Sequence, residues 1–167
     1  MSLIKPFSGI RPKKKFAKQV TYPNLSYLNN YKLNKKLNFV NLLNASSIND
    51  SKKMLRSLND KGIIQQDQSD HFYLYRITYN KKKLLGIVGK INLENYDDKK
   101  ILGHEETFVE RIKKRKEQLL KFNSQISPIY TAYKSKPDSL KKLNNIFKYK
   151  PDYNFKSEDK CRHELWV

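Results

Sequence analysis

The sequence predicts an α+β fold: a mixed or mainly antiparallel sheet of about five or six strands, with about three helices packed against it. Two strand patterns, His71–Tyr79 and Leu84–Ile91, follow each other with a short polar connection between them. A long amphipathic pattern at Phe108–Phe122 predicts a helix, and a second pair of strand patterns, Tyr153–Lys156 and Cys161–Val167, comes last. Runs of strands with segregated helices are typical of this fold class.

The N-terminal part of the chain carries few signals of regular structure. Residues 1–25 show little periodicity, and Pro23 favours an extended conformation in the residue before it. Residues 26–37 have a weak helical pattern. The short apolar run Phe39–Leu43 predicts a buried strand.

The next segment predicts a helix followed by a hairpin or meander. Apolar residues fall on one side of Ser46–Lys61, and Gly62 suits a left-handed cap at the end of that helix. In His71–Tyr79 and Leu84–Ile91, apolar and polar residues mix as in a largely buried sheet. Asn80–Lys83 is the expected connection between these two strands.

The best-specified helix is predicted at Phe108–Phe122. Thr107 and Glu110 have the spacing of a capping box, in which each side chain accepts a free backbone N–H at the start of a helix. The apolar stripe of this helix comprises Phe108, Val109, Ile112, Leu119, Leu120 and Phe122. Opposite charges at i and i+4 spacing support its exposed face.

The remaining elements complete the predicted sheet. Ile126–Tyr133 reads as a strand, and Pro137–Phe147 as an amphipathic helix with its proline in the first turn. Tyr153–Lys156 and Cys161–Val167 form the expected final hairpin. Because the sequence ends on an apolar strand, we expect residues 1–167 to be a single N-terminal domain of a longer protein.

Composition narrows the function classes. The net charge is +19, but Lys accounts for 29 of the 35 basic residues and Arg for only six. Arg is the residue preferred for bidentate recognition of bases and phosphates, so the excess of Lys favours a solvated surface over a nucleic-acid partner. No apolar run has membrane-spanning length, and no signal peptide precedes the N-terminal basic cluster. With Cys161 as the single cysteine, these features predict a cytoplasmic protein without an intrachain disulfide or a cysteine-based zinc site.

One group of residues is a candidate site. His104 and Glu105 precede the helix predicted at Phe108–Phe122, where backbone N–H groups favour anions. Thr107, Arg111 and Arg115 are spaced at i and i+4, so they share one helix face. His104 and Glu105 are the candidate catalytic residues, which could move a proton. Thr107, Arg111 and Arg115 are the candidate phosphate-binding residues, and no metal site is predicted.

Each candidate group has a structural alternative. In the structural reading, Thr107 is simply a helix cap and the arginines are solvated side chains. Asp159, Arg162 and His163 form a second polar group on the final hairpin, where we expect a solvated turn. The glycines never cluster into a P-loop or a dinucleotide fingerprint.

The sequence also resembles a bacterial and archaeal family known as domain of unknown function 1015. The matching blocks occur in order along the chain: IKPFSGIRP, FYLYRI, LLGIVGKINLENYDDKKILGHEET, ISPIYTAYK and DKCRHELWV. The HEET motif followed by a basic helix is the most specific of them. Family members are typically much longer and continue into a segment similar to the ParB/sulfiredoxin-like group, which includes nucleotide-binding proteins and a free-serine kinase.

The resemblance implies an uncharacterised protein whose full-length form binds a nucleotide or a phosphorylated small molecule, in a kinase-like activity. This chain would then supply part of the binding site, and the resemblance does not identify a cofactor. The first alternative is a nucleic-acid-binding protein related to ParB-type partition factors. The second alternative is a structural module with no site of its own.

Overall fold

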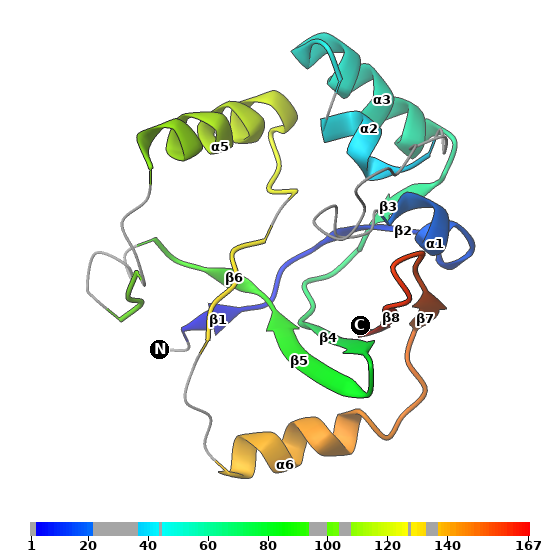
Figure 1. Cartoon of the computed structure of the whole chain (residues 1–167), viewed down its shortest axis with the longest axis vertical. Coiled ribbons are helices and arrows are strands. Elements are labelled where there is room, and N and C mark those ends of the chain that lie inside the picture. Colours follow the sequence, from blue (N-terminus) through cyan, green and yellow to red (C-terminus); the bar gives the residue numbers. More distant parts are fainter. Residues whose placement is uncertain are drawn as a thin grey trace.

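The computed structural model describes residues 3–21, 37–43, 45–93, 100–103, 108–126, 128–132 and 137–167. Within these residues the chain is α+β, with small antiparallel sheets and three helices of seven or more residues (Figure 1). The fold class predicted from the sequence is therefore confirmed. None of the described helices is both long enough and apolar enough to cross a membrane.

The largest sheet has four strands in the order β5-β4-β8-β7. These strands are β4 (Tyr73–Tyr79), β5 (Lys82–Val88), β7 (Tyr153–Lys156) and β8 (Arg162–Trp166). All three pairings are antiparallel, so the two predicted hairpins lie side by side, joined through β4 and β8. The connection between β4 and β5 is a two-residue turn in which Asn80 and Lys81 both have positive φ.

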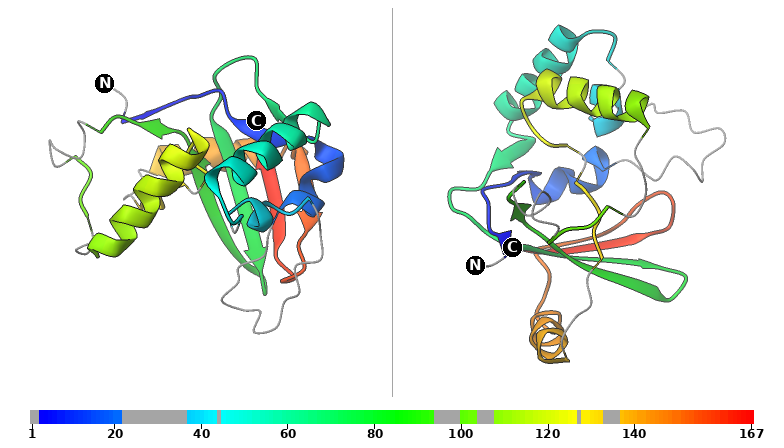
Figure 2. Two further views of the ribbon diagram at one scale, coloured as in Figure 1. Left: turned by 90° about the horizontal axis from the view of Figure 1, so that it is seen from above. Right: turned by 90° about the vertical axis from the view of Figure 1, so that its left-hand side faces the viewer.

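The two faces of this sheet carry different side chains, because successive residues of a strand point to opposite sides. One face carries Tyr73, Tyr75, Tyr153, Phe155, His163 and Leu165. The other face carries Leu74, Arg76, Glu164 and Trp166. Helix α6 (Pro137–Ile146) lies along this second face, where Phe147 meets the Trp166 ring edge-on at 4.9 Å (Figure 2).

Two short strand pairs attach the N-terminal segment to the rest of the fold. β1 (Ile4–Lys5) pairs with β6 (Lys90–Ile91), which follows β5, an edge strand of the four-stranded sheet. β2 (Ile10–Pro12) pairs with β3 (Ile64–Gln66). Residues from the start of the chain are thereby held over the face that carries Tyr73 and Tyr153.

The helices on this side enclose the main apolar core. They are the 3₁₀ turn η1 (Lys14–Phe16), α1 (Ala17–Val20), α2 (Phe39–Leu43), α3 (Ile48–Asp60) and α5 (Val109–Phe122). The buried core cluster consists of Val20, Leu42, Leu58, Ile63, Ile64 and Phe122. The predictions for α3 and α6 are confirmed, and Gly62 has the expected positive φ beyond the end of α3.

The predicted strand at Phe39–Leu43 is wrong, because these residues form helix α2. Asn38 provides the reason: its Oδ1 accepts a hydrogen bond from the Val40 backbone N–H, as in a helix N-cap. The Asn38 side chain also donates to the Thr21 carbonyl, which fixes the start of the helix. A short apolar run fits a buried helix turn as well as a buried strand, and the preceding Asn was the deciding signal.

The predicted strand at Ile126–Tyr133 is also wrong for the residues that the structure describes there, 126 and 128–132. In contrast, β1, β2 and β3 were not predicted. These strands are two or three residues long, too short to produce a periodic pattern. The weak helical pattern of residues 26–37 lies outside the described residues except for Leu37.

Helix α5 forms where expected but begins differently. Its N-cap is Phe108, which makes no side-chain capping hydrogen bond. The predicted capping box involves Thr107, which lies outside the described residues. Only Phe122 of the predicted apolar stripe is buried, whereas Phe108, Val109 and Leu120 are more than two-thirds exposed. The helix thus touches the core near its C-terminal end only, beside α3.

Candidate functional site

The predicted site residues fall into two groups. His104, Glu105 and Thr107 lie outside the described residues, so their roles stay predictions. Arg111 and Arg115 are exposed on α5, where Arg111 lies 5.3 Å from the Phe108 ring and Arg115 donates to Gln118 Oε1. Neither arginine has a described acidic partner.

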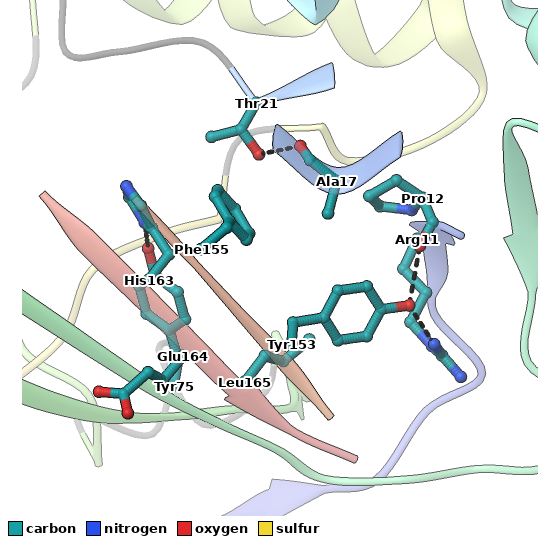
Figure 3. A pocket seen from close by; sticks show the side chains of 10 residues that line it. All are labelled: Arg11, Pro12, Ala17, Thr21, Tyr75, Tyr153, Phe155, His163, Glu164 and Leu165. Carbon is teal, nitrogen blue, oxygen red and sulfur yellow. Dashed lines mark hydrogen bonds between the residues drawn. The ribbon is translucent and has the colours of Figure 1, made fainter. Parts of the chain in front are cut away.

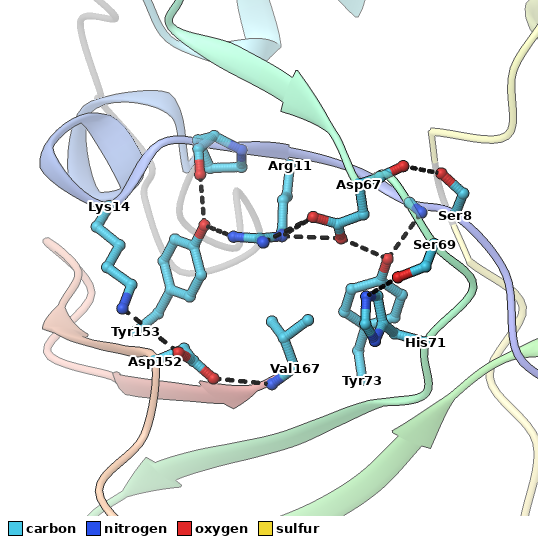
Figure 4. A network of polar contacts seen from close by, with 12 residues as sticks. Ser8, Arg11, Lys14, Asp67, Ser69, His71, Tyr73, Asp152, Tyr153 and Val167 are labelled. Carbon is cyan, nitrogen blue, oxygen red and sulfur yellow. Dashed lines mark hydrogen bonds and ion pairs between the residues drawn. The ribbon is translucent and has the colours of Figure 1, made fainter.

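A different cluster of polar side chains lies where β2, β3, β4 and β7 meet (Figure 4). At its centre, Arg11 Nε lies 2.9 Å from both carboxylate oxygens of Asp67, and Arg11 Nη2 lies 2.6 Å from Asp67 Oδ1. The Asp67 side chain is only 6% exposed. Burial alone would raise the pKa of Asp67, but hydrogen bonds from Arg11 and Tyr73 more than offset this, and the pKa is lowered.

Two tyrosine hydroxyls extend the cluster. Tyr73 Oη donates to Asp67 Oδ2 at 2.7 Å and accepts the Gly9 backbone N–H at 2.7 Å. Tyr153 Oη accepts from Arg11 Nη1 and donates to the Pro12 carbonyl at 2.7 Å. These contacts fasten the N-terminal segment onto the sheet, so the cluster is first of all a structural clamp.

A pocket of about 170 Å³ lies beside this clamp, between α1 and the sheet (Figure 3). Ten residues line it: Arg11, Pro12, Ala17, Thr21, Tyr75, Tyr153, Phe155, His163, Glu164 and Leu165. The alternation of β4, β7 and β8 brings three aromatic side chains and His163 to the pocket side of the sheet. Phe155 and His163 stack with ring centroids 5.2 Å apart.

His163 is a buried polar residue of the pocket wall, at 9% exposed. Its Nδ1 contacts the Tyr75 hydroxyl, and its Nε2 lies 2.6 Å from Ser157 Oγ, which in turn donates to Asp159. Burial lowers the pKa of His163 and raises the pKa of Tyr75 to about 12. Both groups are therefore neutral at pH 7, and they form a hydrogen-bonded chain that ends at the pocket wall.

The opposite face of the sheet holds a second ion pair. Arg76 donates to Glu164 through Nε and Nη2, each at 2.6 Å, and its guanidinium lies 5.6 Å from the Phe147 ring and 5.0 Å from the Trp166 ring. The hydrogen bond from Arg76 lowers the pKa of Glu164. This pair joins the neighbouring strands β4 and β8, in which Arg76 and Glu164 lie opposite each other.

Sequence reasoning missed most of this site. The expectation of a solvated turn at Asp159, Arg162 and His163 is wrong for His163, which is buried, whereas Arg162 is exposed. The available signal was the two-residue period of the last strand, which places His163 on the same side as apolar Leu165. Arg11 and Asp67 gave no local signal, because their pairing depends on the fold.

The described residues contain no group of three or more His, Cys, Asp or Glu side chains that could hold a metal ion. The fold and the pocket define an α+β protein with a small aromatic-lined cavity at the junction of its N-terminal segment and its main sheet. The chain belongs to the DUF1015 family, described as a protein of unknown function, which matches residues 4–167. No curated protein and no solved structure matches the chain.

Proposed function

We propose that this chain binds a nucleotide or a phosphorylated small molecule, with a ring of the ligand in the pocket beneath α1. The observation that carries the proposal is the wall of the pocket, where Tyr75, Tyr153, Phe155 and His163 present aromatic rings. Aromatic side chains stack favourably on nucleobases, whichever base is bound.

The size of the pocket supports one ring as its occupant. An engineered cavity of about 150 Å³ in another protein takes up benzene, whereas sites for whole drug-sized ligands measure about 300–1,000 Å³. A pocket of about 170 Å³ therefore has room for a ring, and the rest of the ligand would extend over the surface.

The charges beside the pocket support a phosphate on that exposed part. Lys13, Lys14, Lys15 and Lys18 belong to the short stretch that also supplies Pro12, Ala17 and Thr21 to the pocket wall. Lys14 has an exposed partner, Asp152, at 3.3 Å, with side chains 64% and 41% exposed. Such a pair is weak and can be opened by a phosphate at little cost.

In this proposal, His104 and Glu105 remain the residues that transfer protons. The residues proposed to contact the phosphate in the reaction remain Thr107, Arg111 and Arg115. The exposure of Arg111 and Arg115 is compatible with such a role. A screen of the full-length protein for nucleotide-dependent phosphorylation of small hydroxyl metabolites tests this part. Activity that is undiminished in His104→Ala and Glu105→Ala variants would contradict the assigned roles.

Binding itself is tested by isothermal titration of this chain with adenosine 5′-monophosphate. We expect saturable binding that weakens about tenfold in Phe155→Leu, which keeps an apolar side chain but removes the stacked ring. Tyr79→Leu is the matched control, since Tyr79 is 45% exposed and lies outside the pocket lining. Equal affinities of wild type and Phe155→Leu would exclude the pocket as the binding site.

The nucleic-acid alternative predicts a different result. A single-stranded oligonucleotide bound by the lysine surface should lose affinity steeply as salt rises, because binding releases counterions. If the oligonucleotide binds with this salt slope and the mononucleotide does not bind, the nucleic-acid function replaces the one proposed here.

A further inference from the structure

The hydroxyl groups around the pocket have a common property: their protons are already committed within the protein. Thr21 Oγ1 donates to the Ala17 carbonyl at 2.9 Å. Tyr153 Oη donates to the Pro12 carbonyl at 2.7 Å. A hydroxyl carries one proton and two acceptor lone pairs, so a hydroxyl that already donates can only accept from a ligand.

The direction of the bond between Tyr75 and His163 follows from the chain behind it. Ser157 has one hydroxyl proton, and its Oγ is close to the Asp159 carboxylate, to the Cys161 carbonyl at 3.0 Å and to His163 Nε2. The carboxylate oxygen of Asp159 and the carbonyl oxygen of Cys161 cannot donate a hydrogen bond. The single Ser157 hydroxyl proton therefore points to one of these two oxygens. His163 Nε2 must then carry the proton that bonds to Ser157 Oγ.

This assignment fixes the state of Tyr75. A neutral imidazole with its proton on Nε2 has an acceptor at Nδ1, so the Tyr75 hydroxyl donates to His163 Nδ1. Burial keeps His163 neutral at pH 7 by lowering its pKa. Tyr75, like Thr21, therefore has only lone pairs left to offer to a ligand.

The opposite side of the pocket has the reverse polarity. In Figure 3, Arg11 lies across the pocket from His163 and Tyr75. Its bonds to Asp67 and Tyr153 occupy the Nε–H, one N–H on Nη1 and one N–H on Nη2 among the described contacts. Because a guanidinium has five N–H donors, each terminal nitrogen keeps one that these contacts do not use.

We infer that the ring bound in the pocket carries a hydrogen-bond donor, such as an exocyclic amino group, directed at the acceptors of Tyr75 and Thr21. An anionic or acceptor group of the same ligand faces Arg11. This inference rests on the proposed function and specifies the class of ligand: an amino-bearing ring is selected over rings that lack the amino group or present a carbonyl in its place.

The test compares three nucleotides that differ at one position of the purine. Adenosine 5′-monophosphate carries an amino group, purine riboside 5′-monophosphate carries hydrogen there, and inosine 5′-monophosphate carries a carbonyl. We expect titration calorimetry at pH 7.5 to show that adenosine 5′-monophosphate binds with about fivefold higher affinity than purine riboside 5′-monophosphate. The difference from the affinity of inosine 5′-monophosphate should be larger still.

Two variants test which acceptor gives the preference for the amino group. Thr21→Val removes the Thr21 acceptor, and Tyr75→Phe removes the Tyr75 acceptor. We expect the amino preference to fall towards unity in at least one of them, while Tyr79→Phe keeps it. Thr21→Val has nearly the original shape, so it remains informative if Tyr75→Phe disturbs His163. Equal binding of all three nucleotides, or a preference unchanged in both variants, overturns the inference while leaving the proposed function intact. Absence of binding by all three overturns the proposed function itself.

Discussion

Arg11 and Asp67, 56 residues apart in the sequence, form a two-pronged ion pair that joins the N-terminal segment to the strand β3 region. Their side chains are 20% and 6% exposed, so the pair is largely shielded from water. Removing one partner of such a pair leaves the other charge without compensation, which is much more destabilising than losing a surface pair.

Asp67→Asn should therefore lower the free energy of unfolding by about 3 kcal/mol. Asp70→Asn is the matched control, because Asp70 and Lys90 form an exposed pair at 3.5 Å with side chains 52% and 54% exposed. The control should lose less than about 1 kcal/mol. Urea denaturation of both variants measures the difference, and equal losses would show that the Arg11 pair is not a clamp.

Gly89 and Gly86 offer a second matched pair. A Cβ on Gly89 would overlap Ile4 Cγ2 and lie 3.0 Å from the Lys5 carbonyl oxygen, whereas a Cβ on Gly86 meets nothing within 4 Å. Gly89→Ala should push β1 away from β6 and cost about 1–3 kcal/mol. Gly86→Ala should be neutral or slightly stabilising. The expectation fails if thermal unfolding ranks the two variants in the opposite order.

Arg76 should not tolerate lysine. Its guanidinium makes two hydrogen bonds to Glu164 and lies 5.0 Å from the Trp166 ring, and an ammonium cannot reproduce this planar arrangement. We expect Arg76→Lys to cost about 1–2 kcal/mol in urea denaturation. Arg162→Lys, at an exposed position on the same sheet, should change stability by less than about 0.5 kcal/mol. If Arg76→Lys left the free energy of unfolding unchanged, the planar contacts of the Arg76 guanidinium would not contribute to stability.

His163 should make stability fall in mildly acidic solution. Its pKa in the folded protein is lowered below the ordinary value of 6.5 by burial, so the unfolded chain binds a proton first as the pH falls. The contribution of neutral His163 is complete above about pH 7 and is lost progressively below pH 6.5, down to its folded pKa. Urea midpoints between pH 7.5 and 5 measure this slope, which His163→Gln should reduce. A slope of the same size in the variant would assign it to other groups.

The parts of the fold that could be predicted are those with local signals. The hairpin of β4 and β5 has a long strand pattern and a short turn, and α3 has both an apolar side and a terminal glycine. The missed strands β1 and β2 acquire their structure only by pairing with distant segments. The fold class could be predicted from the sequence, but the pairing of the first residues with distant strands could not.

The candidate site shows the same limit. The helix with Arg111 and Arg115 formed as predicted, because its pattern is local, yet its apolar stripe is mostly exposed. The pocket combines residues 11–21 with strands near residues 75, 153 and 163, which no spacing along the chain connects. Period-two alternation could have indicated that His163 faces inward, but not which residues it meets.

The most direct test of the central claim is a titration of the ¹⁵N-labelled chain with adenosine 5′-monophosphate, followed by amide chemical shifts. We predict saturable shifts concentrated at Thr21, Tyr75, Phe155 and His163, around the aromatic pocket. Shifts confined to α5 near Arg111 and Arg115, or no saturable shifts at millimolar ligand, would contradict the assignment of ligand binding to this pocket.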